Sequence, residues 1–166
     1  MAQAQQLRRT ISVLVHNRPG VLARVSSLFS RRGFNIDSLA VSTTEDAEVS
    51  HMTIVVSGDE AVLEQIGKQL NKLIDVIKVR DHSRDTIVDR ELSLIKVHAT
   101  PQTRPEVMQI VDVFRGRIAD LSESSLIVEV TGTPDKTDAL LRLLRPFGIK
   151  EMVRTGKVVM VRGERE

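Results

Sequence analysis

The chain has 166 residues, of which 41% are hydrophobic and 28% charged, the balance of a globular protein with one large domain or two small ones. Because it contains no cysteine, a disulfide framework, a thiolate metal site and a cysteine nucleophile are excluded, and a cytoplasmic location is expected. Its 24 basic and 22 acidic residues are mixed along the chain, and four Phe without Tyr or Trp provide few base-stacking side chains, which argues against nucleic-acid binding.

The first 80 residues carry the pattern of one βαββαβ unit. Apolar residues alternate in the first strand, and Pro19 suits the first helical position because it lacks an N–H group. Gly33 provides a left-handed helix end. The predicted elements are a strand at 10–16, a helix from Pro19 to Gly33, a hairpin of 34–44 and 49–57, a helix after Asp59 and a strand at 76–79.

The pattern repeats after a charged segment at 81–91, which is predicted to be a linker. Thr103 and Glu106 have the spacing of a capping box ahead of a helix. The other predicted elements are strands at 92–99, 117–121 and 126–131, a helix from Pro134, and two closing strands at 149–153 and 157–161 around Thr155 and Gly156. The expected fold class is α+β, with two tandem ferredoxin-like units at 1–80 and 92–166.

Sequence motifs for catalysis or metal binding are lacking. The four histidines are not at metal-ligand spacing, and no Gly-Lys-Ser phosphate loop, GxSxG elbow or GxGxxG turn occurs. Neighbouring carboxylates such as Asp59 and Glu60 fall where helix starts and turns favour them. We therefore expect no catalytic residue, metal or cofactor in this chain. The polar residues Met1–Gln6 and the lack of a long apolar segment predict neither a signal peptide nor a membrane span.

The turn from Asn17 to Gly20 is the best candidate for a ligand site. A helix N-terminus presents unpaired N–H groups and a partial positive charge, so a carboxylate can dock there, and Gly20 leaves its approach open. Taken alone, however, a Pro-Gly pair more often only turns the chain into a helix.

The context strengthens the ligand interpretation, because this turn joins the first strand of a βαββαβ unit to its first helix. There the segment NRPGVL resembles the signature of ACT domains, small modules that bind amino acids and regulate metabolic enzymes. The flanking RTISVLVHNRPGVLARVSSLFSRRGFNIDSLAV, the following HMTIVVSGDEAVLEQIGKQLNKLIDVIKV and the C-terminal VFRGRIADLSESSLIVEVTGTPDKTDALLRLLRPFGIKEMVRTGKVVMVRG resemble the regulatory (small) subunit of acetohydroxyacid synthase, also called acetolactate synthase.

The resemblance implies a non-catalytic subunit with an N-terminal ACT domain and a C-terminal ACT-like domain. Its partner would be a separate catalytic subunit that uses thiamine diphosphate, Mg²⁺ and usually FAD, none of which should bind here. The chain would activate that partner and confer feedback inhibition by valine or another branched-chain amino acid. The implied ligand-binding residues are Asn17, Pro19, Gly20, Val21, Leu22, Asn35 and Ile36.

The second predicted strand, 34–44, is at a sheet edge in this fold, yet Asp37 is its only charged residue and it has no Lys or Pro to blunt the edge. We expect a partner to cover it. The resemblance implies a homodimer of side-by-side ACT domains, in which Asn35 of one chain faces the Asn17–Leu22 turn of the other. Such a site would hold a carboxylate at the helix, an ammonium at amide or backbone oxygens and a branched side chain against apolar groups.

Two other classes of function remain open. The first is a stand-alone ACT-type amino-acid sensor or transcriptional regulator, although no helix-turn-helix is recognisable in the sequence. The second is a small ferredoxin-like enzyme, which would need an acid/base or nucleophile set that the motifs do not provide. Which branched-chain amino acid binds best depends on how two chains pack.

Overall fold

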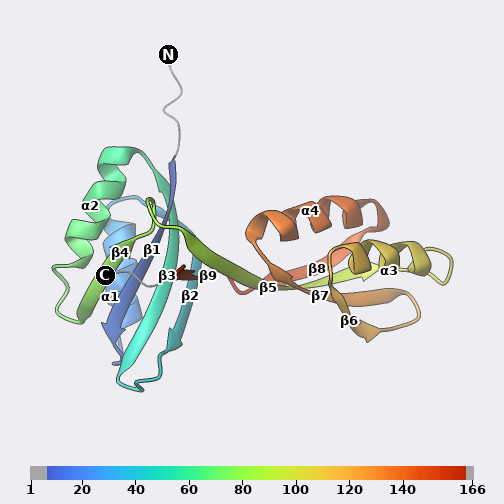
Figure 1. The fold of residues 1–166 in the computed structure, drawn as a ribbon, viewed down its shortest axis with the longest axis horizontal. Helices are drawn as coiled ribbons and strands as arrows, with labels where there is room; N and C mark the ends of the chain where they lie inside the picture. Colours follow the sequence, from blue (N-terminus) through green and yellow to red (C-terminus); the bar gives the residue numbers. More distant parts are fainter. Residues whose placement is uncertain (1–6, 164–166) are drawn as a thin grey trace, which may run out of the picture. The chain divides into compact units, whose positions relative to one another are not determined.

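The computed structural model describes residues 7–163, except for the Val62 side chain (Figure 1). The polar start at residues 1–6, on which the expectation of no signal peptide rests, lies outside the described residues. Among the described helices, none is long and apolar enough to cross a membrane. The chain divides into two units, which are described separately below. The first contains the residues up to Val88 and those from Val159 onward, and the second contains Asp89–Val158.

The first unit has the βαββαβ order of a ferredoxin-like fold. Its sheet has the strand order β2-β3-β1-β4, and each neighbouring pair is antiparallel. Helices α1 and α2 cover one face of this sheet (Figure 1). The elements are β1 Leu7–His16, α1 Val21–Arg31, β2 Asn35–Thr43, β3 Val49–Gly58, α2 Glu60–Leu70 and β4 Val76–Asp81.

Two periodicities place the first core between the helices and the sheet. In β1 every second residue points to the helices, so Ile11, Val13 and Val15 are buried. In α1 a four-residue spacing buries Val21 and Val25. The whole cluster consists of Ile11, Val13, Val15, Val21, Val25, Phe29, Met52, Ile54, Val56, Leu63, Ile66 and Leu70. Val15 at the end of β1 and Val21 at the start of α1 both belong to this core, so it anchors the two ends of the β1–α1 connection.

The second unit repeats this order and confirms the predicted tandem fold. Its sheet has the order β6-β7-β5-β8, with α3 and α4 packed on one face (Figure 1). The elements that follow β4 along the chain are β5 Ile87–His98, α3 Arg104–Val113, β6 Arg117–Leu121, β7 Ser125–Gly132, α4 Pro134–Leu144, the 3-10 helix η1 Arg145–Phe147, β8 Ile149–Arg154 and β9 Val158–Val161. Most of β9, from Val159 onward, belongs to the first unit. Its core contains Ile95, Val97, Ala99, Val107, Val111, Leu126, Val128, Val130, Leu140, Leu141 and Leu144.

The last two strands, which the sequence predicted around Thr155 and Gly156, both pair with an earlier strand and not with each other. Both β8 and β9 pair with β5, which at 12 residues is long enough to hold them one after the other. Thr155 joins the two segments, because its N–H donates to the Leu92 carbonyl at 3.0 Å and its Oγ1 accepts from the Leu92 N–H at 3.1 Å. Gly156, at φ 79°, then turns the chain onward along β5.

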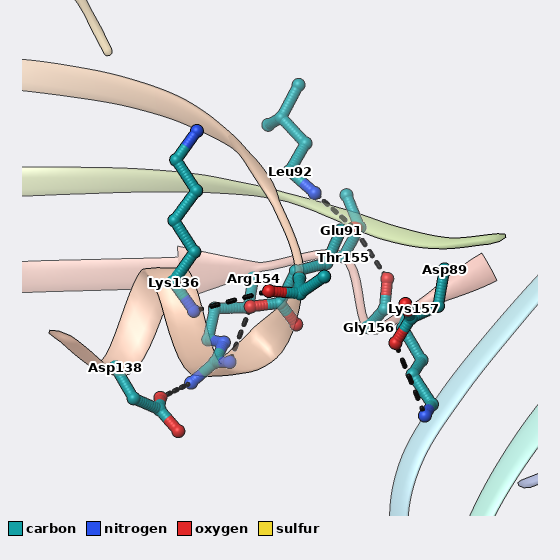
Figure 2. A network of polar contacts seen from close by, with 10 residues as sticks. Asp89, Glu91, Leu92, Lys136, Asp138, Arg154, Thr155, Gly156 and Lys157 are labelled. Carbon is teal, nitrogen blue, oxygen red and sulfur yellow. Dashed lines mark hydrogen bonds and ion pairs between the residues drawn. The ribbon is translucent and has the colours of Figure 1, made fainter. Parts of the chain in front are cut away.

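A polar network fixes this end of β5 and β8 (Figure 2). Arg154 donates through Nη2 to Glu91 at 2.5 Å and through Nη1 to Asp138 at 2.7 Å. Burial by itself would lower the pKa of the Arg154 guanidinium, but the bonds to Glu91 and Asp138 raise that pKa above its usual value. The Glu91 side chain is only 4% exposed, and Arg154 gives this buried carboxylate a positively charged partner.

The charged segment 81–91 differs from the linker that its composition suggested. Asp81 ends β4, and residues 87–91 already belong to β5. His82 and Glu91 are buried. Charge density misled the prediction because part of the charge in this segment is paired, Asp85 with Arg80 and Glu91 with Arg154. The unit predicted at 92–166 also differs at its end, since the chain from Val159 onward groups with the first unit.

Two helix starts also differ from the sequence expectation. Helix α1 begins at Val21, after Gly20 rather than at Pro19. In α3, Thr103 makes no capping bond to the helix, and its Oγ1 instead accepts from the Thr100 N–H at 3.0 Å. The Thr100 Oγ1 accepts from the Thr103 N–H at 3.3 Å, so a reciprocal box forms three residues earlier than predicted, without Glu106.

Candidate functional site

The β1–α1 turn is tied to the hairpin between β2 and β3. The Asn17 N–H donates to the Glu48 carbonyl at 2.7 Å, and the Asn17 Nδ2 donates to the Ala47 carbonyl at 2.9 Å. The Asn17 side chain is exposed, and its amide oxygen accepts no hydrogen bond from the described residues. Since the NH₂ group is already used, this oxygen is oriented as an acceptor, which suits an ammonium group.

Gly20 gives the turn its shape. Its φ of 82° is in the left-handed region that glycine adopts without strain. Gly20 has no side chain to cap α1, and the described residues provide no hydrogen-bond acceptor for the N–H groups of Leu22 and Ala23. These two donors lie in the first turn of α1, where the helix carries its partial positive charge. The exposed helix start is therefore suited to a carboxylate.

The other predicted residues of the turn divide into a buried and an exposed group. Val21 is 3% exposed and belongs to the core, so its side chain anchors the start of α1 against the sheet. Leu22 is 45% exposed and offers an apolar surface on the outside of the turn. Pro19 is also exposed and precedes the helix. The turn thus combines backbone donors with one apolar side chain.

Asn35 and Ile36 begin β2, as the sequence predicted, but at the other end of the sheet. The register pairs His16 with Val49 and Asn35 with Ser57, which are opposite ends of β3. Strands rise by about 3.3 Å per residue, so roughly 25 Å of strand separates the two groups. The structure of one chain therefore does not bring Asn35 next to the Asn17–Gly20 turn.

The surroundings of Asn35 are polar. Its Nδ2 donates to Asp37 Oδ1 at 2.8 Å, and Asp37 also accepts from Ser57 Oγ at 2.5 Å. Arg8 lies 3.6 Å from the same carboxylate. The Asn35 side chain is exposed, whereas Ile36 packs against the core. Because β2 is an edge strand, this group lies where a second chain can reach it.

The comparisons with known proteins agree with this architecture. Residues 11–78 match the family model described as the AHAS small subunit-like ACT domain, and residues 90–163 match the model of the small subunit of acetolactate synthase. A probable acetolactate synthase small subunit from Archaeoglobus fulgidus is 56% identical over 96% of this chain and 100% of its own length. The chain belongs to the acetolactate synthase small-subunit family.

Other members of the small-subunit family support the same assignment. The acetolactate synthase small subunit of Mycolicibacterium smegmatis is 57% identical, over 94% of this chain and 92% of the relative. The crystal structure of the acetolactate synthase small subunit from Thermotoga maritima superposes with a TM-score of 0.86 and 41% identity, covering 96% of this chain and 99% of that one. The similarity extends through both units.

The first unit of this small subunit also contains a buried set of polar contacts that the sequence did not reveal. His82 Nε2 is 2.7 Å from Ser12 Oγ, and His82 Nδ1 is 3.0 Å from Asp85 Oδ2. Asp85 also accepts from Arg80 Nε at 2.9 Å. Ser12 and His82 are 8% and 7% exposed, and these contacts fasten the β4–β5 connection to β1. Ser12 and His82 are 70 residues apart, so no local sequence motif predicts their contact.

A further residue near the turn was missed for the same reason. Arg24 Nη2 lies 2.7 Å from Asp75 Oδ2, and the Asp75 carbonyl accepts from the His16 N–H at 2.8 Å. Arg24 appeared in the sequence only as an exposed position of a helix, while Asp75 precedes β4. Within the described part of the small subunit, no group of three or more His, Cys, Asp or Glu residues is arranged to hold a metal ion.

Proposed function

We propose that this chain activates a separate acetolactate synthase catalytic subunit and makes it sensitive to feedback inhibition by valine or another branched-chain amino acid. The observation that carries the amino-acid part is the pair of unpaired N–H donors at Leu22 and Ala23, at a turn opened by Gly20. The family membership supports the regulatory part. We assign the chemistry of thiamine diphosphate, Mg²⁺ and FAD to the catalytic partner.

The proposed ligand site needs two chains. Strands β1 and β2 are both antiparallel to β3, so they run in the same direction and the Asn17 turn lies at the Thr43 end of β2. If β2 pairs antiparallel with β2 of a second chain across a two-fold axis, Asn35 of one chain comes to the end of the sheet where the partner has its turn. Each dimer then contains two equivalent sites.

Each part of a branched-chain amino acid has a counterpart in such a site. The carboxylate faces the N–H donors of Leu22 and Ala23, and the ammonium faces the Asn17 amide oxygen. The branched side chain contacts the exposed part of Leu22. Asn35 and Ile36 of the second chain close the site, so the ligand stabilises one arrangement of the dimer and thereby acts on the enzyme.

Reconstitution tests the proposal. Acetolactate formation by the purified catalytic subunit is measured with and without this chain, over a valine titration. We expect the chain to raise the rate and valine to lower it again, with leucine, isoleucine and alanine as comparison ligands. Failure to bind or activate the catalytic subunit, with valine still raising the thermal midpoint of the chain alone, would favour a stand-alone sensor instead.

A further inference from the structure

The Arg24 side chain folds back over the turn. A Cβ atom built on Gly20 would lie 3.4 Å from Arg24 Nη1, so the guanidinium borders the space that glycine leaves open. The backbone places it there, because the Arg24 N–H donates to the Gly20 carbonyl at 3.0 Å in the first turn of α1. The open space above Gly20 therefore has a cation on one side.

Asp75 holds this cation in position. The Asp75 side chain is 10% exposed, and its carboxylate lies 2.7 Å from Arg24 Nη2. Its main-chain carbonyl accepts from the His16 N–H at 2.8 Å, which connects it to the end of β1. The Arg24 guanidinium thus contacts a residue that is itself bonded to the end of β1, and this ion pair favours the rotamer that lies beside Gly20.

The guanidinium retains binding capacity after this contact. It has five N–H donors in a planar fork, and the ion pair with Asp75 uses one nitrogen, Nη2. The Arg24 side chain is 51% exposed, so the other donors are accessible. Together with the N–H groups of Leu22 and Ala23, they form a set of donors around Gly20 that is complementary to a carboxylate.

We propose that Arg24 is a ligand-binding residue, which binds the α-carboxylate of the amino acid at the β1–α1 turn. This inference rests on the proposed function and specifies how the same site selects its ligand. Asp75 acts as a positioning residue, since it touches Arg24 and not the ligand. A branched-chain compound without a negative charge at this position then loses the contact with Arg24 while keeping its apolar contacts.

The test compares valine with valinamide, which has the same side chain and ammonium group but no carboxylate. Binding of both to the full chain is measured by calorimetry at about pH 7, where the amine stays largely protonated. We expect the wild-type chain to prefer valine. Arg24→Gln should weaken valine binding by about tenfold or more, the effect of one charge-assisted bond, and valinamide binding much less.

Arg31→Gln is the matched control. Like Arg24, Arg31 is on α1 and lines a cavity of about 690 Å³ beside this helix, but it lies at the far end of α1 from Gly20. It should leave both affinities unchanged. Equal losses for valine and valinamide in Arg24→Gln, or no loss, would overturn the role of Arg24. Absence of amino-acid binding in the wild-type chain would instead overturn the proposed function.

Arg24→Lys covers the case in which the glutamine variant does not fold. Lysine retains a positive charge beside Asp75 but lacks the forked donors. We expect the preference of Arg24→Lys for valine over valinamide to be weaker than that of the wild type and stronger than that of Arg24→Gln. A folded lysine variant with the full wild-type preference would contradict the contact through guanidinium donors.

Discussion

At Gly20 the backbone conformation and the proposed ligand site both depend on the absence of a Cβ atom. Any other residue there adds a Cβ beside Arg24 and must adopt a left-handed conformation. The left-handed region costs an L-residue about 1 to 2 kcal/mol, although Asp and Asn visit it more readily than most. A substitution at Gly20 therefore changes both stability and the space for the ligand.

We predict that Gly20→Asp removes the response to valine. The new carboxylate comes within reach of Arg24 and of the free helix donors, so it occupies the place of the ligand carboxylate. The thermal midpoint should fall by a few degrees, the effect of about 1 kcal/mol in a chain of this size. Acetolactate formation over a valine titration measures the response.

Gly163→Asp is the control for this prediction. Gly163 also has a positive φ, at 69°, and nothing lies within 4 Å of a Cβ built on it. It should retain inhibition by valine. Unchanged valine inhibition in Gly20→Asp would show that the ligand does not use this turn.

We also predict that His51 makes the fold sensitive to acid. Burial, and to a smaller extent the nearby His82, lower the pKa of His51 from its usual 6.5. The folded state then keeps His51 neutral while the unfolded chain takes up a proton near pH 6.5. Stability from this group is present above that pH and is lost as the pH falls through 6.5 towards the lowered pKa.

Thermal unfolding at about pH 7.5 and about pH 5.5 measures this effect, since histidine is the side chain that changes charge in this interval. His51→Gln should show a smaller drop in midpoint between the two conditions than the wild type. An equal drop in both proteins would assign the acid sensitivity to other groups.

At the scale of elements, the sequence predicted most of the fold because each unit has clear periodicity. Alternation in β1 and four-residue spacing in α1 identify the core faces directly. The pairing of β9 with β5 was not predictable, because the bond between Thr155 and Leu92 that leads into it joins residues 63 positions apart. Local patterns identify elements, whereas partner choice along a long strand depends on the whole sheet.

The candidate site stays a prediction. The resemblance implied the Asn17–Leu22 turn and the Asn35–Ile36 pair, and the structure adds how their N–H and amide groups are bonded. Arg24 was not identified, since its role depends on the left-handed Gly20 and on Asp75 about 50 residues later. The register also shows that the two groups are far apart in one chain, which periodicity alone cannot reveal.

The edge strand β2 provides a test of the proposed dimer. Val41 is 43% exposed on this strand, and we predict that Val41→Lys converts the dimer to monomers because a charge on each chain then meets the two-fold interface. Light scattering coupled to size exclusion measures the mass. Valine binding should weaken in parallel, since each site needs both chains.

Val153→Lys is the matched substitution. Val153 is 58% exposed and lies on β8, the edge strand of the second sheet. The mass should remain that of the wild type. A dimer that survives Val41→Lys would contradict pairing through β2.

At the scale of the whole molecule, the chain crosses the boundary between the units twice. It passes from the first unit to the second within β5 and returns within β9, so Val159–Val161 complete the first unit. Val159 is 8% exposed, and the Arg162 N–H donates to the Thr86 carbonyl at 2.9 Å. A cut in 81–91 therefore removes part of the first unit along with the second.

We predict that a fragment ending at Val88 unfolds at a lower temperature than the first unit in the intact chain. A version in which residues 157–163 are rejoined to Val88 through a flexible Gly/Ser linker should recover much of the difference, because the linker restores the missing pairing at high effective concentration. Thermal unfolding of both fragments measures the effect. Identical midpoints would show that the returning segment adds no stability.

The return of the chain to its first unit has a consequence for biosynthesis. Domains at the N-terminus generally fold first while the ribosome is still translating the rest. Here residues 159–163, which group with the first unit, are translated after the whole of the second unit. The first unit thus reaches its final form only after the whole second unit has been synthesised, and a product that stops before Val159 lacks part of the first unit.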